Sequence, residues 1–468
     1  MSVQQAVALT IQKVSQQPTV LQPVTSITQQ ASAQQPSVQQ AVTPTGQQAC
    51  AQFSEYPNFR DGDVLIISPT DKTWRLHSTI LINASPVIKS ILAKYPAAHT
   101  TKSQREEGLT IKWKLVMIDE PDAAHVDPDG LTFKTFKIPD RKGNISSFEM
   151  PRNANGLGAK PQYNKLYDNF FKCLYNINPC FTNDPNDPEA REYITDALTL
   201  IEAAQYLEAI PAVRVAVEAN LLRLNTVLWN HICSRPDAWV HAAARLQSPL
   251  IFREAMLHIV GCFHLRGVIN EELLEDLDGK HGVLGRQVWG LIVKKAKELK
   301  DKKLRVERHL LEYYPDRMLH KEDESSIPGR AIYSEDIYLW QALMIFRQFC
   351  ASACLSNYHH RANDSGLAFY RNIASGNYLR PETLGSFYEI FAMTPKGKQR
   401  LAQVLDLIKD DMKPVVKELL VDRTQGDRGR NALPLDHLTC VEILEEEFPW
   451  YVAPIVETDG DVQMSGAL

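Results

Sequence analysis

The sequence predicts a small α+β domain, with a mixed sheet flanked by helices and a long insertion, followed by an all-α C-terminal half. Short apolar runs with the period-two alternation of strands gather in the first half of the 468 residues. From about residue 226 the apolar residues repeat with the 3.6-residue period of helices. The first 52 residues are rich in Gln, Ser, Thr, Val, Ala and Pro, with Lys13 as their one charged residue, so a disordered Gln-rich N-terminus is expected.

A β-hairpin is predicted at the start of the α+β domain. Val64–Ile67 is an apolar run too short for a helix, and the turn residues Pro69–Lys72 follow it. Trp74 and Leu76 then alternate with polar neighbours, as in a strand with one packed face and one solvated face. Two such strands joined by a tight turn form a hairpin.

Two short helices are predicted to follow the hairpin. Ser78 can cap the first, and Ser85 can cap the second with Pro86 at its first helical position. The second helix would turn an apolar face inward, made of Val87, Ile88, Ile91 and Leu92.

These residues, in this order, resemble the front half of the BTB/POZ domain. The family has an Asp opening the first strand, a His closing the second, a Leu in the next helix and Ser-Pro before the following one. The positions that match here are Asp63, His77, Leu81, Ser85 and Pro86. The resemblance implies an α+β BTB/POZ fold for this part of the chain.

Later segments extend the resemblance to about residues 56–225. The segment Tyr163–Tyr175 is similar to the family's next helix, and Ile194–Leu222 is similar to its closing helical pair, broken at Pro211. The link between the two halves, residues 95–162, is longer than usual and contains the strand-like stretches 109–118 and 131–138. Such an insertion resembles large fungal members of the family.

The resemblance also implies a surface for partner proteins. Family members that bind cullins do so through the helices after the second strand and around the later aromatic helix. The signature and partner-binding residues predicted in this way are Asp63, His77, Leu81, Ser85, Pro86, Ile88, Tyr167 and Phe170. The partner would be a cullin, or a second copy of the chain through the BTB domain.

The helical half is predicted to begin with three helices, broken near Arg235-Pro236 and at Ser248-Pro249. Its position after a BTB domain resembles a BACK-like extension. A basic run at 294–305 favours the solvated face of an amphipathic helix, with Ile292, Ala296, Leu299 and Leu304 facing inward; a nuclear-import or nucleic-acid patch is the alternative. Further helices are expected near 381–421 and 434–447. The predicted organisation is a tail at 1–52, a BTB domain at 53–225, a BACK-like extension at 226–360, a helical region at 361–454 and a flexible tail at 455–468.

Composition and motifs argue against several classes of function. The formal charge of −5 does not favour nucleic acid or an anionic membrane as partner, and no apolar stretch is long enough to span a bilayer. No glycine-rich phosphate loop, HExxH or GxSxG motif occurs. Cys350 and Cys354 lie one helical turn apart near His359 and His360, but a cysteine pair in an apolar helix is more often buried packing than a metal site. No catalytic residue, cofactor, metal or small-molecule substrate is therefore predicted.

The function predicted is that of a protein-interaction module without enzymatic activity, in the cytoplasm and/or the nucleus. The leading hypothesis is an adaptor or scaffold, such as a substrate adaptor of a cullin-RING ubiquitin ligase. The alternative is a nuclear transcriptional regulator that acts through protein partners, suggested by the Gln-rich tail and the basic run.

Overall fold

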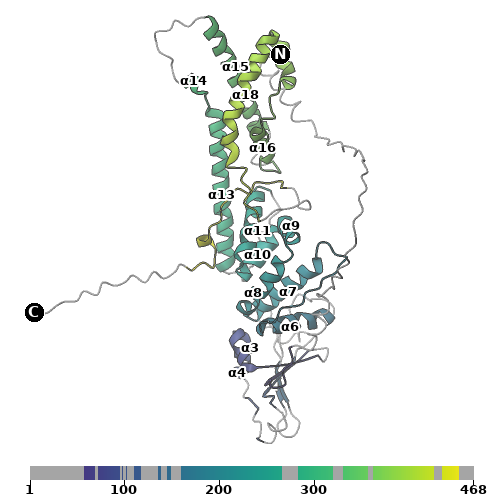
Figure 1. The fold of residues 1–468 in the computed structure, drawn as a ribbon. Helices are drawn as coiled ribbons and strands as arrows, with labels where there is room; N and C mark the ends of the chain where they lie inside the picture. The colour runs from purple at the N-terminus through teal and green to yellow at the C-terminus, as the bar shows by residue number, and fades with distance from the viewer. Residues whose placement is uncertain are drawn as a thin grey trace, which may run out of the picture. The chain divides into compact units, whose positions relative to one another are not determined.

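A computed structural model describes the fold in two compact units (Figure 1). The residues described are 57–68, 72–94, 97–98, 102, 110–116, 135–138, 145–148, 160–265, 283–319, 330–356, 362–425 and 435–452. The first unit takes the described residues up to Trp229, together with Arg245–Ser248, and the second takes Asn230–Ala244 and the chain from Pro249 onward. The predicted Gln-rich tail, most of the 95–162 insertion and the tail at 455–468 lie outside the described residues.

A five-stranded mixed sheet lies at the start of the first unit. Its spatial order is β2-β1-β3-β5-β4, in which β1 pairs antiparallel with β2 and parallel with β3, while β5 runs parallel to β3 and antiparallel to β4. The strands are β1 (Val64–Ile67), β2 (Thr73–Leu76), β3 (Trp113–Val116), β4 (Thr135–Ile138) and β5 (Ile145–Phe148). The predicted hairpin is therefore present, and each strand-like stretch of the insertion supplies one strand. The strand β5 was not predicted.

Alternation along the hairpin explains why these residues form strands. Val64 and Ile66 are buried while their neighbours are half-buried, and Trp74 and Leu76 are buried on the paired strand. In the turn, the Ser68 N–H donates to the Lys72 carbonyl at 2.7 Å, which closes the hairpin. One apolar face is thereby fixed toward the core, since a one-residue slip would expose it.

The described residues of the first unit also form the helices α3 (Ser78–Ala84), α4 (Pro86–Lys94), α6 (Lys160–Leu174), α7 (Arg191–Tyr206) and α8 (Ile210–Leu222). The predicted cap on α4 is present, because the Ile88 N–H donates to Ser85 Oγ at 3.1 Å. The predicted cap on α3 is not. Ser78 is instead the first helical residue, and its N–H donates to Asp63 Oδ1 at 2.6 Å.

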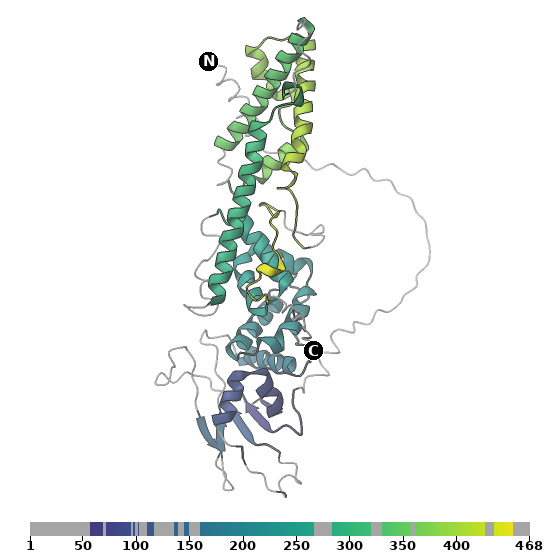
Figure 2. The ribbon, with the colours of Figure 1, turned by 90° about the vertical axis from the view of Figure 1, so that its left-hand side faces the viewer.

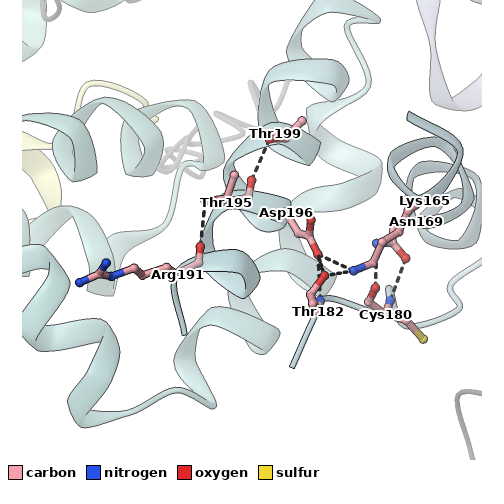
Figure 3. Close-up of polar contacts among 8 residues, drawn as sticks. All are labelled: Lys165, Asn169, Cys180, Thr182, Arg191, Thr195, Asp196 and Thr199. Atoms are coloured by element: carbon pink, nitrogen blue, oxygen red, sulfur yellow. Dashed lines mark hydrogen bonds and ion pairs between the residues drawn. The ribbon is translucent and has the colours of Figure 1, made fainter. Parts of the chain in front are cut away.

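A set of polar contacts ties the connection between α6 and α7 to both helices (Figure 3). Asp196 of α7 accepts from the backbone N–H of Thr182 at 2.8 Å and from Lys165 of α6 at 2.6 Å. Asn169 of α6 exchanges two hydrogen bonds with the backbone of Cys180, at 2.8 and 3.0 Å. Because backbone groups of the loop are satisfied by side chains of both helices, the connection holds α6 and α7 in one arrangement.

The second unit is built almost entirely of helices (Figure 2). The three helices predicted around the breaks at Arg235-Pro236 and Ser248-Pro249 are present, since α10 begins at Pro236 and α11 begins at Pro249. The helices α13, α15, α16 and α18 pack on one another, so the structure does not divide this region at residue 360. The elements from the boundary onward are α9 (Thr226–Ser234), α10 (Pro236–Leu246), α11 (Pro249–Cys262), α13 (Val283–Glu312), α14 (Asp316–Leu319), α15 (Arg330–Ser356), α16 (Leu367–Ser375), η1 (Pro381–Leu384), α17 (Gly385–Ile390), α18 (Pro395–Lys417) and η2 (Glu445–Glu447).

The helix α13 carries the basic run, and its inward face differs from the prediction. Ile292 and Leu299 are buried as expected, but Leu304 is exposed and Lys303 takes the inward position beside it. Lys295 is buried as well. The stripe that faces the core therefore includes two lysines, whose long aliphatic stems can pack while the ammonium groups find partners.

The predicted helix at 434–447 is wrong. Residues 435–444 form neither helix nor strand, and the 3₁₀ turn η2 follows them. Six residues in this stretch, from His437 to Val441 and Ile443, are buried, although their spacing is neither helical nor alternating. Packing on both sides of this segment overrides the helical propensity of its Leu and Glu residues. Among the described residues, no helix is both long and apolar enough to cross a membrane.

Replacing Ile88 with Asp is expected to destabilise the first unit by several kcal/mol. The Ile88 side chain is fully buried on α4, so the new carboxylate would lose its water without gaining a partner. The matched control is Lys89→Asp at the neighbouring exposed position, which is expected to stay within about 0.5 kcal/mol of the parent. Urea unfolding followed by circular dichroism measures both; equal stability of the two variants would contradict the burial of Ile88.

Candidate protein-binding surface

The residues predicted from the sequence to bind a partner mostly lie inside the first unit. Leu81, Ile88 and Phe170 are fully buried, and Tyr167 is nearly so. Ser85 is buried too, where its hydroxyl donates to the Leu207 carbonyl at 2.5 Å. These side chains hold the fold together and present no surface to a partner. Pro86 is exposed, at the first position of α4.

Asp63 and His77 have local structural roles. Besides the Ser78 N–H, Asp63 accepts from the Ser78 hydroxyl at 2.8 Å, and Lys112 lies 3.3 Å away. Burial raises the pKa of Asp63, but the Ser78 hydrogen bonds and Lys112 outweigh it and lower the pKa overall. The backbone N–H of His77 donates to the Tyr175 hydroxyl at 2.8 Å, and its ring packs against Phe59. Both residues therefore fasten the end of β2 to its surroundings.

Cys350 and Cys354 lie in α15 and do not have the character of thiolate ligands. Burial raises the pKa of Cys350 well above its ordinary value, and it raises the pKa of Cys354 to about 12. Metal ligation by cysteine requires the thiolate. Across the part of the chain that the structure describes, no group of three or more His, Cys, Asp or Glu residues is arranged to hold a metal ion. His359 and His360 lie outside it.

The most unusual surface in the second unit lies on the first half of α15. Four large apolar side chains follow one another at spacings of four, three and four residues, and each is exposed: Tyr333 by 64%, Ile337 by 37%, Trp340 by 50% and Met344 by 37%. We refer to these four residues as the α15 stripe. At 100° per residue they fall within about 60° of one another around the helix.

The opposite face of α15 is the one that packs into the unit. Its buried residues are Ala342, Leu343, Ile345, Phe346, Phe349 and Cys350. Phe349 stacks on Tyr378 with ring centroids 4.8 Å apart, and Phe346 contacts the rings of Tyr313 and Tyr378. The helix α15 lies alongside α18 (Figures 1 and 2). The helix thus has two apolar faces, of which one is used by the fold and the other faces solvent.

Ion pairs and one close packing contact fix the orientation of the exposed half of α15. Arg317 of α14 lies 2.9 Å from Glu335, and Arg400 of α18 lies 3.3 Å from the same carboxylate. Hydrogen bonding from Arg317, together with the charge of Arg400, lowers the pKa of Glu335. Tyr338 approaches α18 at Gly397 so closely that a Cβ there would lie 2.8 Å from its hydroxyl. The α15 stripe is therefore held facing outward on a positioned helix.

The sequence contained a signal for this surface. The segment LWQALMIFRQF is apolar on more sides than one core face requires. Plotting residues 333–350 on a helical wheel separates two apolar faces, and one of them has the narrow 4-3-4 spacing of a coiled-coil seam.

Comparison with known proteins finds one family model that matches this region of the chain. A fungal FF domain model matches residues 315–418, the range from α14 through α18. No curated protein and no solved structure matches the chain. FF domains are protein–protein interaction modules, so this part of the chain is similar to a module that binds other proteins. The fungal character expected from the sequence agrees with the matched model.

The BTB/POZ assignment is wrong. No BTB/POZ model matches, and the family that does match lies in the helical half, outside residues 56–225. The predicted fold class fails with it, because helices dominate the described residues and the family model that matches is that of an FF domain, in the helical half. The physical reason is that Asp63, His77 and Ser85 perform local tasks, such as capping a helix or closing a strand. Many folds with a strand, a turn and a helix need the same residues at the same places.

Truncation of Trp340 is expected to leave stability nearly unchanged, whereas truncation of Phe346 is not. Trp340→Ala removes a half-exposed ring and should shift the free energy of unfolding by no more than about 0.5 kcal/mol. Phe346→Ala opens a cavity at a fully buried position on the same helix and should cost about 3–5 kcal/mol. Denaturant unfolding of both variants measures the difference. A large loss in Trp340→Ala would mean that the ring is part of the core.

Proposed function

We propose that this chain is a protein-interaction scaffold, and that the α15 stripe is the surface on which a partner protein docks. The observation that carries the proposal is the exposure of Tyr333, Ile337, Trp340 and Met344 on the face of α15 opposite its packed side. A contiguous row of large apolar side chains on the surface of a folded unit is typical of a binding site. The match of residues 315–418 to an interaction module supports the same conclusion.

The geometry of the stripe favours a helical partner. Spacings of four, three and four residues are those of alternating a and d positions, which receive the knobs of a second helix. The stripe spans roughly 16 Å along the helix axis, from 1.5 Å per residue, which suits about three turns of a partner helix. Trp340 and Tyr333 are the residue types that most often dominate binding energy. The partner is therefore a protein that offers an amphipathic helix with an apolar row of its own.

Introducing negative charge into the stripe tests this function. Affinity purification from cells, followed by mass spectrometry, is expected to lose specific partners when Ile337 and Trp340 are both replaced with Glu, because two carboxylates would have to be desolvated at the centre of the interface. The control is Leu407→Glu, which places a charge on a still more exposed apolar residue of α18 that lies outside the stripe. Retention of the same partners by the double variant would refute the docking surface.

Binding by a purified partner would then be measured directly. A partner lost in the double variant is expected to bind the parent chain with an affinity at least tenfold higher than the double variant, and to bind the Leu407→Glu variant as tightly as the parent. Unchanged circular dichroism of all three proteins separates loss of binding from loss of folding. An affinity reduced equally by Leu407→Glu would place the interface elsewhere on the unit.

The role of cullin-RING substrate adaptor rested on the BTB/POZ assignment and is not carried forward. The alternative, a nuclear regulator acting through protein partners, rests on the Gln-rich tail, which lies outside the described residues, and on the basic run of α13. A location in the cytoplasm and/or nucleus, and a role without catalysis, are part of the present proposal; they rest on the sequence, and microscopy of a tagged chain would test the location.

A further inference from the structure

A row of four titratable side chains links α11 to the segment at 435–444. Glu254 and His258 lie one turn apart on α11, and both are fully buried. His258 Nε2 lies 3.3 Å from Glu254 Oε1, and His258 Nδ1 lies 2.8 Å from Nε2 of His437, which is also buried. His437 Nδ1 in turn lies 2.7 Å from Asp436 Oδ1, on a carboxylate that is largely exposed. The row therefore runs from a buried carboxylate to a solvated one through two imidazole rings.

Counting protons shows that this row holds one more than two neutral rings carry. Each of the three contacts, carboxylate to ring, ring to ring and ring to carboxylate, needs one N–H to serve as donor. Two neutral imidazoles supply two N–H groups, and an ionised carboxylate supplies none. The third donor requires a third proton, on a ring or on the Glu254 carboxyl, and the raised pKa of His258 favours the ring. A cationic ring would also pair with the fully buried side chain of Glu254, which accepts the backbone N–H of Gln425 as well.

The surroundings of His258 agree with a bound proton. Burial lowers the pKa of His258, but hydrogen bonding and charge from Cys233 and Glu254 outweigh it and raise the pKa overall. Cys233 comes from α9. Burial, together with the charges of Asp436 and Cys233, raises the pKa of Cys262 on α11 to about 12. Glu254 also accepts the backbone N–H of Gln425 at 2.6 Å.

We propose that Glu254, His258, His437 and Asp436 form a proton-operated latch, which holds residues 435–444 against α11 while the extra proton is bound and loosens them when it leaves. Without that proton, one of the three contacts brings two lone pairs face to face. The contact that is weakened in this way lies where the segment packs closely against α11, at Gly261. A Cβ on Gly261 would lie 2.5 Å from the Leu438 carbonyl oxygen and 2.6 Å from the His437 ring, so only glycine allows the segment to lie there.

The direction of the pH effect follows from the proton count. A group whose pKa is higher in the folded state than in the unfolded state contributes stability that is fully present below the unfolded pKa, about 6.5 for His. This contribution is lost as the pH rises through the folded pKa. The segment is therefore held more tightly in mild acid than in mild base. Its protection can fall by up to about tenfold for each pH unit between the unfolded and the folded pKa, for one linked proton.

The other end of the same segment supplies an internal control. Glu447 of η2 lies 2.8 Å from both Lys294 and Lys295 of α13. Burial raises the pKa of Glu447, but the two lysines outweigh it and lower the pKa to about 2. This ion-paired anchor does not titrate between pH 5.5 and 8.5, so it stays closed while the latch opens.

Hydrogen–deuterium exchange of the full chain at pH 6.0 and pH 8.0 tests the latch, with protection factors corrected for the intrinsic pH dependence of exchange. Protection of residues 437–444 is expected to fall by tenfold or more between the two pH values, while residues 445–448 change less than twofold. In His437→Phe, protection of 437–444 is expected to be low at both pH values. His309→Gln, an exposed histidine of α13, is expected to behave as the parent chain. Equal protection of 437–444 in the parent chain at both pH values would overturn the latch.

Two further variants separate the proton from simple packing. Gly261→Ala is expected to loosen 437–444 at both pH values, because it acts by contact and not by charge, although Ala ordinarily favours a helix over Gly. Cys233→Ala is expected to keep the pH dependence, since the two carboxylates still demand the proton; loss of the dependence would assign the proton to the thiol instead.

A direct count of the protons completes the test. Nitrogen-15 spectra of the histidine rings distinguish a cationic ring from either neutral tautomer. One cationic ring that is absent in both His258→Gln and His437→Phe is expected at pH 6.0. Two neutral rings at pH 6.0 would overturn the proposal even if the segment were found to loosen at high pH.

Discussion

The inward face of α13 is the constraint on which the second unit depends. Along this 30-residue helix the positions that face the core include Lys295 and Lys303 among aliphatic residues. A buried ammonium group needs an anion or a strong acceptor, because its desolvation otherwise costs several kcal/mol. Glu298 of the same helix lies 3.0 Å from Lys295 and supplies part of this requirement, and the segments that pack over α13 supply the rest.

Different parts of the chain meet that requirement at the two lysines. The ammonium group of Lys295 forms an ion pair with Glu447, so the C-terminal segment has to lie along the first half of the helix. Lys303 donates to the hydroxyl of Ser365 at 2.7 Å, and burial lowers its pKa to about 8 although Glu307 and Asp364 act in the opposite direction. Glu307 in turn accepts from the buried Tyr370 hydroxyl at 2.7 Å, which positions α16. Two lysines thus determine where two distant segments of the sequence pack.

The local elements of the fold could be predicted from the sequence because their causes are local. The β1–β2 hairpin follows from alternation over a few residues, and the breaks before Pro236 and Pro249 follow from the chemistry of proline at a helix start. The inward role of Lys303 could not be predicted, because hydropathy favours Leu304 and the deciding acceptor, Ser365, is 62 residues away. The non-helical conformation of 435–444 could not be predicted either, because it depends on distant residues: Gly261 and a row of side chains spread over 183 residues.

For the candidate binding surface, the residues could be predicted from the sequence but their exposure could not. Its residues could be read from a helical wheel, yet only packing decides which of two apolar faces is the core. Phe346 and Phe349 meet Tyr378, while no residue of the described part of the unit buries Tyr333 or Trp340. The family signature failed in a related way. Asp63 and Ser85 were recognised by type and spacing, but their hydrogen bonds to Ser78 and Leu207 are tasks that many folds share.

The two attachments of the C-terminal segment respond to opposite ends of the pH scale. The Glu447 anchor contributes stability above the unfolded pKa of a glutamate, about 4.3, and loses it as the pH falls toward 2. The histidine latch contributes stability below about pH 6.5 and loses it as the pH rises through the folded pKa of His258. Both hold together only in mild acid. As the pH rises through the folded pKa of His258, the segment stays fastened at Glu447 while the latch loosens, so the change in pH acts on one end of the segment alone.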